Sequence, residues 1–456
     1  VQVEIDPDRA AEHLAAAVRI PTVSHGSESP VEHEAFKTLH QLLEEQYPLL
    51  HEAAERIVIS DYSLVYQWKG RDPELDPVLF LAHQDVVPAD PSTLDEWTHP
   101  PFSGAIEDGY IWGRGTLDCK NTLIGAMEAA EALLAEGFQP RRTVMFAFGH
   151  DEEIGGPKGA RKVSAWMQEE GIRAAAVLDE GGTILKGGFP GVESPTAVIG
   201  VVEKGHIDVR MTVTATPGHA STPPRHTAVG ILARAITRVE NHPMPAHVDR
   251  VMPMFRGLGS SLPFRYRIIF ANRWLFNGIL RRILEANPQM NASIRTSIAA
   301  TIIHGGVKEN ILPRQVYANL NIRLLPGDTI DTVLEHLRRV IDDDRISLEL
   351  TGNSREEASP SSPADGAVFN SIREAIQRIF GPIPVTPYIM LGGSDSRYYS
   401  PISNHIYRFS PEVMTPEDLD RVHGINERTS VEGFASNVRF FMTIIRAWSL
   451  HLEDAG

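Results

Sequence analysis

Three short apolar runs of the sequence each end in side chains that can bind a cation. His83-Gln84-Asp85 follows the first run, His150-Asp151-Glu152-Glu153 the second and Asp179-Glu180-Gly181-Gly182 the third. Imidazole nitrogens and carboxylate oxygens are ligands for zinc and for harder divalent cations. Taken singly, a histidine at a strand end is more often hydrogen-bonded, and an acidic run is more often a solvated turn. Because three such endings occur in one half of the chain, the pattern favours a metal site.

A glycine-rich segment between the first two runs offers a carboxylate that two cations could share. It reads Gly113-Arg114-Gly115-Thr116-Leu117-Asp118-Cys119-Lys120, and its glycines allow a tight turn. Asp118 stands just before a predicted helix, so one interpretation is a helix cap. The other is a bridging ligand, because its two oxygens can face two cations that polarise a carbonyl and activate a shared water.

The adjacent acids Glu152 and Glu153 fit two further roles. One carboxylate can bind metal while its neighbour takes a proton from the attacking water as a general base. The alternative is a pair of surface charges on a turn. Asp85 stands two residues after His83 and suits orientation of the imidazole. Much later in the chain, His423 offers another imidazole. Considered alone, a histidine is more often structural than a metal ligand.

The elements that position these residues alternate between strands and helices. Apolar runs at 78–82, 143–148 and 174–178 predict buried strands. Residues 121–136 have apolar positions at helical spacing and are followed by Gly137, which predicts a helix. This alternation predicts an α/β fold with a mostly parallel sheet flanked by helices. Sites in such sheets form beyond the carboxyl ends of the strands, where the polar residues stand.

The pattern changes near Ile199 and predicts a second, smaller α+β domain inserted into the first. Residues 206–214 alternate between apolar and polar side chains, as a half-exposed strand does. We predict a catalytic domain made of residues 1–198 and 356–456, and a lid or dimerisation domain made of residues 199–355.

Within the second domain, residues 243–301 form an insert that is rich in aromatic side chains. They include Phe255, Phe264, Phe270, Trp274 and Phe276. One interpretation is a local core or a subunit contact. The other is an apolar wall for a fatty or aromatic group of the substrate.

Composition excludes several classes of function. Among 456 residues, 43 Lys+Arg stand against 59 Asp+Glu, and the formal net charge of −16 argues against a nucleic-acid partner. Cys119 is the only cysteine, so neither a disulfide framework nor a thiolate zinc cluster can form within the chain. No apolar run reaches the roughly 18 residues of a membrane span. The chain begins at Val1 without a visible signal peptide, which is compatible with secreted, periplasmic and cytoplasmic locations.

Five motifs resemble a known family of two-zinc hydrolases, in the family's order and over nearly the whole chain. They are HQD at His83, GRGTLDCK around Asp118, DEE at Glu152, LDEGG at Asp179 and the late His423. These motifs resemble the metallopeptidase and amidohydrolase family of carboxypeptidase S, aminoacylase and glutamate carboxypeptidase. The segment EWTHPPFSG at 96–104 is most similar to the branch that contains carboxypeptidase S and the secreted N-fatty-acyl amino acid synthase/hydrolase.

The resemblance implies a site for two Zn²⁺ ions, for which Co²⁺ or Mn²⁺ could substitute. His83 and Asp179 would hold one ion, Glu153 and His423 would hold the other, and Asp118 would bridge both.

The resemblance also implies the roles of the neighbouring residues. Glu152 would be the general base, and Asp85 would support His83. Relatives usually carry an aspartate where this chain has Cys119, and we expect the cysteine to be buried.

Further matches concern substrate binding. His219 in the segment PGHAS resembles a histidine that reaches the site of a partner subunit and stabilises the oxyanion, which implies a homodimer. Asn310 and Arg323 resemble positions that grip the carboxylate of the substrate, and an arginine fork suits a carboxylate. On the residues alone, His219 could equally be structural and Arg323 could form an internal salt bridge.

The glycine-rich loop Gly392-Gly393-Ser394 resembles a loop at the substrate site of the family. The nearest relatives read GNTDTR there, and Gly393 lacks the asparagine side chain of that pattern.

These features predict metal-dependent hydrolysis of an amide bond next to a free carboxylate, in an N-acyl amino acid or at the C-terminus of a peptide. The reaction can run in reverse when the products are concentrated. The alternatives are a dipeptidase or aminopeptidase, which would recognise a free amine, and a non-catalytic metal- or ligand-binding homologue. The spare carboxylate of Glu152 favours an enzyme, because binding alone needs no base.

Overall fold

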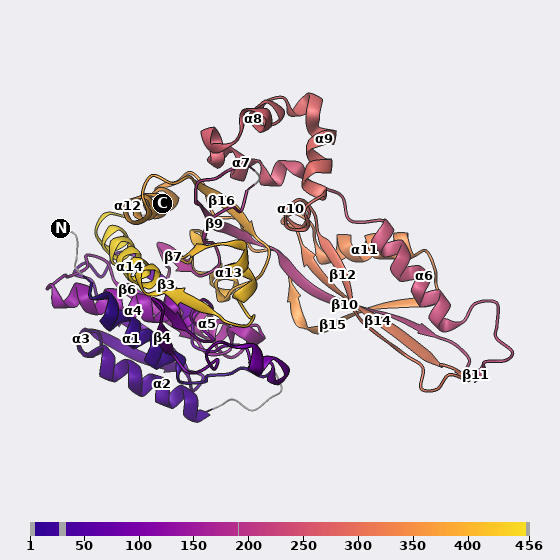
Figure 1. Cartoon of the computed structure of the whole chain (residues 1–456), viewed down its shortest axis with the longest axis horizontal. Coiled ribbons are helices and arrows are strands. Elements are labelled where there is room, and N and C mark those ends of the chain that lie inside the picture. Colours follow the sequence, from indigo (N-terminus) through magenta and orange to yellow (C-terminus); the bar gives the residue numbers. More distant parts are fainter. Residues whose placement is uncertain (1–4, 27–32, 190, 453–456) are drawn as a thin grey trace.

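The computed structural model describes residues 5–26, 33–189 and 191–452. Its largest sheet has ten strands and lies in the indigo, magenta and yellow half of Figure 1. In sheet order these are β1 (Ala54–Ile59), β2 (Ser63–Trp68), β6 (Val144–Gly149), β3 (Val78–His83), β7 (Ala176–Asp179), β17 (Ile406–Arg408), β9 (Thr196–Glu203), β8 (Ile184–Leu185) and β18 (Val413–Met414), with β16 (Val385–Met390) paired to β9. β3 runs parallel to both β6 and β7, so the carboxyl ends of these strands meet at one edge.

Helices cover both faces of this sheet, which confirms the predicted α/β fold. On β3, Phe80 stacks on Phe146 and on Trp448 at one face. Leu79 packs on the opposite face with Val163. Because alternate residues are buried on opposite faces, the strand sequences are unbroken apolar runs. The first face is covered by α1 (Pro7–Val18), α4 (Lys120–Ala135), α12 (Ala367–Phe380) and α14 (Val431–His451), and the second by α5 (Ala160–Glu169).

Shorter elements border the large sheet. They are α2 (His33–Gln46), α3 (Pro48–Ala53), α13 (Pro416–Arg421) and a three-stranded sheet of β19 (Arg428–Ser430), β5 (Tyr110–Trp112) and β4 (Ala105–Glu107). These three strands join the region before α4 to the region before α14.

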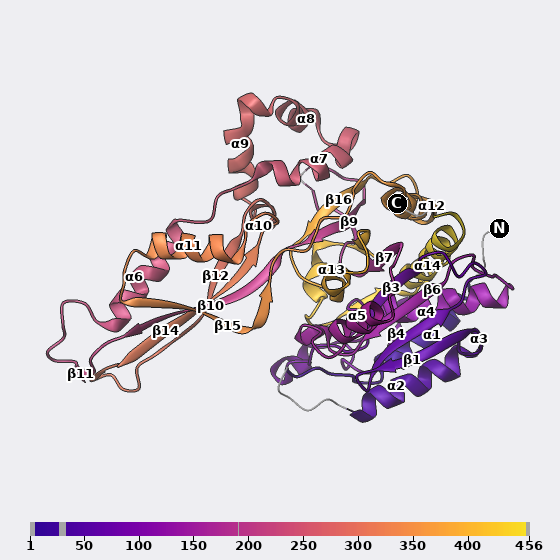
Figure 2. The same ribbon diagram turned by 180° about the vertical axis from the view of Figure 1, so that it is seen from behind.

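A separate four-stranded antiparallel sheet, which we name the small sheet, projects from the large one (Figures 1 and 2). Its strands in order are β12 (Ser297–Gly305), β14 (Gln315–Leu324), β10 (Gly205–Thr214) and β15 (Ile346–Glu356), and α6 (Ala228–Asn241) and α11 (Ile330–Ile341) pack on it. At its far tip, β11 (Gly218–His219) pairs with β13 (Ile311–Leu312). The predicted inserted α+β part is therefore confirmed as a fold. The chain leaves the large sheet after Glu203, and the domain limits at 198 and 355 remain predictions.

The aromatic-rich insert contains four α-helices, whose apolar core is shared with Val198 of the large sheet. They are α7 (Met252–Leu258), α8 (Phe264–Ala271), α9 (Arg273–Glu285) and α10 (Pro288–Ile294). The rings of Phe255 and Phe270 stack with centroids 4.2 Å apart. α7 is tied to the large sheet, because the Thr386 hydroxyl donates to the Met254 carbonyl at 2.6 Å.

No helix in the described ranges is both long enough and apolar enough to cross a membrane.

Candidate active site

Asp118 lies between two imidazoles at the carboxyl edge of the large sheet. Its Oδ1 is 3.0 Å from His83 Nε2, and its Oδ2 is 2.9 Å from His423 Nε2. His83 is the last residue of β3, Asp118 precedes α4, and His423 follows α13. A carboxylate that presents one oxygen to each of two nitrogen ligands has the geometry of a bridge between two cations.

A further carboxylate stands beside each imidazole. Glu180 Oε1 is 3.2 Å from His83 Nε2, and Glu153 Oε2 is 3.2 Å from His423 Nε2. The potential ligand atoms form two overlapping groups that share Asp118, with atoms within 4.8 Å of one another in each group. Glu153 Oε1 is buried and, among the described residues, has no hydrogen-bond partner. These nitrogen and oxygen donors, with an unused buried carboxylate oxygen, fit two divalent cations.

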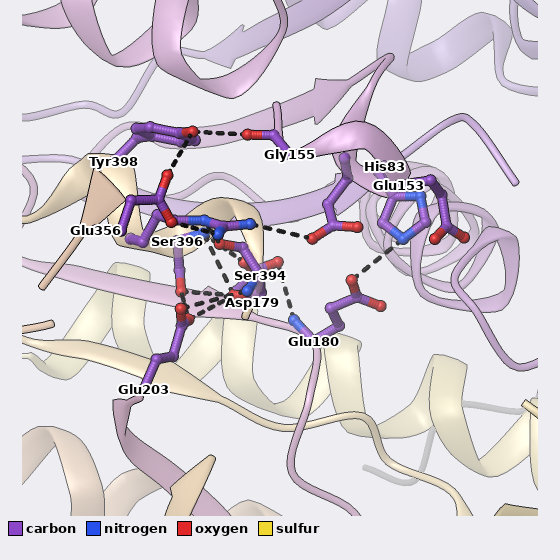
Figure 3. A network of polar contacts seen from close by, with 12 residues as sticks. His83, Glu153, Gly155, Asp179, Glu180, Glu203, Glu356, Ser394, Ser396 and Tyr398 are labelled. Atoms are coloured by element: carbon purple, nitrogen blue, oxygen red, sulfur yellow. Dashed lines mark hydrogen bonds and ion pairs between the residues drawn. The ribbon is translucent and has the colours of Figure 1, made fainter. Parts of the chain in front are cut away.

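The structure brings Glu180, rather than the predicted ligand Asp179, into the cluster beside His83 (Figure 3). The Asp179 carboxylate accepts from the backbone N–H of Ser396 at 2.8 Å and lies on the other side of the chain. Successive side chains at the end of a strand point in opposite directions, so only one of two adjacent acids can face His83. Both acids stand at the predicted strand end, and Glu180 is the one whose side chain lies beside His83.

Asp85 holds two parts of the site in place. Its Oδ1 is 3.3 Å from His83 Nδ1 and accepts from the Glu152 N–H at 3.1 Å. Its Oδ2 accepts from the Glu153 N–H at 3.2 Å and from the Ser24 hydroxyl at 2.7 Å. The Asp85 backbone carbonyl also lies 2.9 Å from His83 Nδ1, so Asp85 contacts the imidazole through both groups and fixes the turn that carries both glutamates.

Glu427 organises the glycine-rich turn before α4, a role that the sequence analysis did not find. Its Oε1 accepts from the N–H groups of Gly115 and Leu117, both at 2.9 Å. Its Oε2 accepts from Arg114 Nη1 at 2.6 Å. Glu427 stands four residues after His423, so one short segment supplies an imidazole and positions Asp118.

Burial and neighbouring charged groups shift the pKa values of several residues in the cluster. Burial raises the pKa of Glu152 well above its usual range, and the nearby carboxylates Asp395 and Glu180 raise it further although His83 lowers it. Burial raises the pKa of Glu180 to about 7. Hydrogen bonds to Asp118 and Glu153 raise the pKa of His423 to about 10. Without a cation the site therefore retains protons near neutral pH, which cations would displace.

Cys119 is buried, as expected. Its sulfur accepts from the backbone N–H of His83 at 3.2 Å, and it lies in the same group of potential ligands as His83 and Glu180.

Arg397 links the general-base candidate Glu152 to the small sheet. Its Nη2 is 3.6 Å from Glu152 Oε1, and its Nη1 donates to Glu356 Oε2 at 2.7 Å. The neighbouring Tyr398 hydroxyl donates to the Gly155 carbonyl at 2.6 Å and contacts Glu356 Oε1 at 3.2 Å. Glu356 is the last residue of β15, where the chain returns to the large sheet. The turn at Glu152 and the junction of the two sheets are thus mechanically connected.

The glycine-rich loop lies beside this network. The Ser394 hydroxyl donates to buried Glu203 at 2.7 Å, and Arg408 Nε donates to the same carboxylate at 2.6 Å. A Cβ at Gly393 would lie 3.0 Å from Arg397 Nη1, whereas one at Gly392 would meet nothing within 4 Å. Absence of the asparagine side chain at Gly393 therefore leaves room for the Arg397 guanidinium.

Arg323 is half-buried on β14, opposite His206 in the register of the small sheet. Among the described residues, no carboxylate lies within ion-pair distance of its guanidinium, so the predicted alternative of an internal salt bridge is not found. Burial lowers the pKa of Arg323, and the charge of Arg397 lowers it further. A half-buried arginine without a carboxylate partner can receive an anionic group of a ligand.

His219 and Asn310 come together far from the cluster of the same chain. The Ala220 N–H donates to the Asn310 carbonyl at 3.0 Å, and His219 Nδ1 lies 2.7 Å from the Ser221 hydroxyl. Both residues are exposed at the tip around β11, at the opposite end of the molecule from β3 and β7 (Figures 1 and 2). A single chain in this conformation does not bring them to His83.

Comparison with known proteins agrees with this architecture. The model of peptidase family M20/M25/M40 matches residues 79–447. The chain is 40% identical to an N-fatty-acyl-amino acid synthase/hydrolase of Xenopus tropicalis over 97% of this chain and 86% of that protein. It is 39% identical to a probable carboxypeptidase S-like protein of Dictyostelium discoideum over 96% of this chain and 84% of that protein.

Solved structures share the fold at low sequence identity. An M20 family metallo-carboxypeptidase of Sulfolobus solfataricus has a TM-score of 0.71 at 17% identity, covering 96% of this chain and 99% of that chain. A dinuclear metal-binding peptidase of the same family from Bacillus subtilis has a TM-score of 0.60 at 16% identity, covering 97% and 99%. The resemblance inferred from the motifs is confirmed by the family match and by relatives that align over nearly the whole chain. This chain belongs to peptidase family M20/M25/M40 and is a hydrolase of that metallopeptidase and amidohydrolase family.

Proposed function

We propose that this chain is a two-zinc amidohydrolase that cleaves the amide bond of N-acyl amino acids or releases the C-terminal residue of peptides. The observation that carries the proposal is the position of Asp118, which offers one oxygen to His83 and the other to His423. A carboxylate outside the ligand groups, Glu152, stands beside them.

The proposed ligands are His83 and Glu180 for one ion and Glu153 and His423 for the other, with Asp118 shared. When bound, two zinc ions supply polarisation of the scissile carbonyl and a lower pKa for the attacking water. Co²⁺ or Mn²⁺ can substitute, because all these ligands are nitrogen or oxygen donors.

Glu152 is the proposed general base. Its carboxylate takes a proton from the attacking water and delivers it to the leaving nitrogen. The raised pKa of Glu152 belongs to the metal-free site, where burial and neighbouring carboxylates favour the protonated form. The positive charge of two cations would stabilise the carboxylate form that a base requires.

The free carboxylate of the substrate is the proposed partner of Arg323. Among the described residues, no carboxylate lies within ion-pair distance of the guanidinium, which lies near the junction of the two sheets. A relative named for N-fatty-acyl-amino acids and another named for carboxypeptidase S both act, by those names, on molecules with a carboxylate beside the amide. Recognition of a free carboxylate on the substrate, rather than of a free amine, distinguishes the proposed enzyme from a dipeptidase or aminopeptidase.

A homodimer is proposed to complete the site. His219 and Asn310 lie at the tip of the small sheet, away from the cluster of their own chain. In a symmetric pair the tip of one chain can reach the site of the other, where His219 would stabilise the oxyanion and Asn310 would contact the substrate.

A substrate panel tests this function. N-acyl amino acids with short and long acyl chains are compared with dipeptides whose C-terminus is free or amidated. Each is assayed before and after chelation and after return of Zn²⁺, Co²⁺ or Mn²⁺. We expect turnover only with a free carboxylate, loss on chelation and recovery with metal.

Two variants complete the experiment. Glu152→Gln is expected to lower kcat by about 100-fold or more while two metals stay bound. Glu170→Gln, at an exposed acid at the end of α5, is the matched control and should leave kcat unchanged. Full turnover in Glu152→Gln would contradict the assigned base, and preference for amidated substrates with a free amine would favour an aminopeptidase.

A further inference from the structure

Several large apolar side chains are exposed on the consecutive helices α8 and α9. On α9, Leu275, Ile279 and Ile283 are spaced four residues apart and are 59%, 51% and 40% exposed. Phe264 on α8 and Trp274 on α9 are 72% and 85% exposed. Isolated apolar residues are common on protein surfaces, but several large ones on two consecutive helices mark a binding surface.

The core of the insert does not use these side chains. Leu280 and Leu284 are the buried residues of α9, and they pack with Phe255 and other residues of the insert. The helix α9 therefore carries more apolar side chains than it buries, and the row from Leu275 to Ile283 faces outward.

Arginines flank the exposed row, which we name the α8–α9 surface. Residues 250–284 contain seven arginines and no acidic residue, in a chain whose formal net charge is −16. Arg265, Arg267, Arg281 and Arg282 are exposed. Of these four, only Arg281 has a carboxylate partner in the described residues, Glu285 at 3.6 Å.

We propose that the α8–α9 surface docks onto anionic lipid bilayers. A helix with Trp, Phe and Leu on one side and arginines beside them lies in the plane of a bilayer interface, where the rings enter the acyl boundary and the guanidinium groups meet the head groups. The helices project from the rest of the molecule, so a flat surface can reach them (Figures 1 and 2). The anionic head groups attract these arginines and repel the acidic remainder of the chain. The protein is therefore held with the α8–α9 surface against the bilayer.

A symmetric contact between two α8–α9 surfaces is a weaker explanation. Such a contact would place the arginines of one copy against those of the other, and residues 250–284 offer no carboxylate to balance them. An apolar wall for the substrate is also disfavoured, because α8 and α9 lie away from β3 and β7 in both views (Figures 1 and 2).

Co-sedimentation of the full chain with lipid vesicles tests the proposal. Vesicles of phosphatidylcholine alone are compared with vesicles that also contain phosphatidylglycerol, without substrate. We expect binding to the anionic vesicles, little binding to the neutral ones, and weaker binding as salt is added. Because no hydrolysis is measured, failure of the proposed function would leave this result unaffected.

Variants at exposed positions identify the surface. Trp274→Ser is expected to weaken vesicle binding about tenfold through loss of buried apolar area. Arg265→Gln and Arg282→Gln should each weaken it on the order of fivefold. Val307→Ser is the matched control, because Val307 is 90% exposed in the turn between β12 and β13 and its loss should leave binding unchanged. Trp274 emission should shift to the blue with anionic vesicles, and Trp274→Phe should lack the shift.

Equal binding of Trp274→Ser and wild type to anionic vesicles would overturn the proposal, as would absence of binding by the wild type. If the wild type does not bind vesicles and is a dimer, whereas Trp274→Ser is a monomer, the surface would instead be a contact between copies of the chain.

Discussion

At the scale of single residues, the choice between Asp179 and Glu180 as a ligand has a direct test. Glu180→Gln is expected to weaken binding of one metal by about 100-fold or more, because Glu180 stands 3.2 Å from His83 Nε2. Asp179→Asn should retain two metals, because an amide oxygen can still accept from the Ser396 N–H. Metal content after dialysis at fixed free zinc measures both variants. The reverse pattern would restore Asp179 as the ligand.

Glu412 gives a prediction for stability against pH. Burial raises its pKa to about 7 although Thr429 and Asn121 donate to its carboxylate. A carboxyl group whose pKa is raised on folding contributes stability below its usual pKa and loses it as pH rises through the folded value. Glu412→Gln removes that loss, so its stability relative to wild type should increase by on the order of 3 kcal/mol between pH 4.5 and pH 8.

Urea unfolding at several pH values measures this difference, since other titrating groups are common to both proteins and cancel. A difference that does not change with pH would show that Glu412 is ionised in the folded state without cost.

Sequence alone could identify most of the candidate site at this scale. His83, Asp118, Glu153 and His423 are residue types that bind metals, and the structure brings all four together. Glu180 could not be distinguished from Asp179, because the two are adjacent and only the direction of the side chain separates them.

At the scale of elements, close packing of α4 on α14 predicts sensitivity at Gly125. A Cβ there would lie 2.1 Å from Asn437 Oδ1 and 3.1 Å from its Cγ, in a fully buried contact. Gly125→Ala is therefore expected to lower the free energy of unfolding by about 1–3 kcal/mol. Gly278→Ala in α9 is the control, because a Cβ there meets nothing within 4 Å and should add up to about 1 kcal/mol through helix propensity.

Thermal unfolding of the two alanine variants gives the comparison. Equal melting temperatures for both would mean that Asn437 moves aside and that the contact is not tight.

Long periodic elements could be predicted closely, whereas short ones could not. The helix expected over 121–136 is α4 at Lys120–Ala135, and the strand expected over 206–214 is β10 at Gly205–Thr214. The two-residue pair β11 and β13 was not predicted, because two residues carry no periodicity.

At the scale of the whole molecule, the proposed dimer predicts complementation between inactive variants. His219→Ala and Glu152→Gln should each have little activity. Mixed dimers contain one site with Glu152 from one chain and His219 from its partner. After subunit exchange at equal amounts, activity should recover to about a quarter of wild type, since half of the dimers are mixed and each has one intact site.

Activity of the mixture is measured before and after mild dissociation and reassociation. No recovery, with exchange verified by differently labelled chains, would mean that His219 does not act on the site of a partner.

The placement of the insert could not be predicted from the order of the elements. The helices α7 to α10 lie between β10 and β12 of the small sheet in the sequence, yet α7 hydrogen-bonds to β16 of the large sheet. Contacts between segments more than a hundred residues apart leave no local pattern.

That placement has a consequence for dissecting the protein. Deletion of residues 199–355 would remove the hydrogen bond between α7 and Thr386. It would also expose Val198 and its apolar neighbours to solvent, because they belong to the same core as the insert. The lid and its helical insert are continuous in sequence but are anchored to different halves of the molecule. A minimal catalytic chain would therefore have to keep α7 to α10 and bridge the two ends of the small sheet around them.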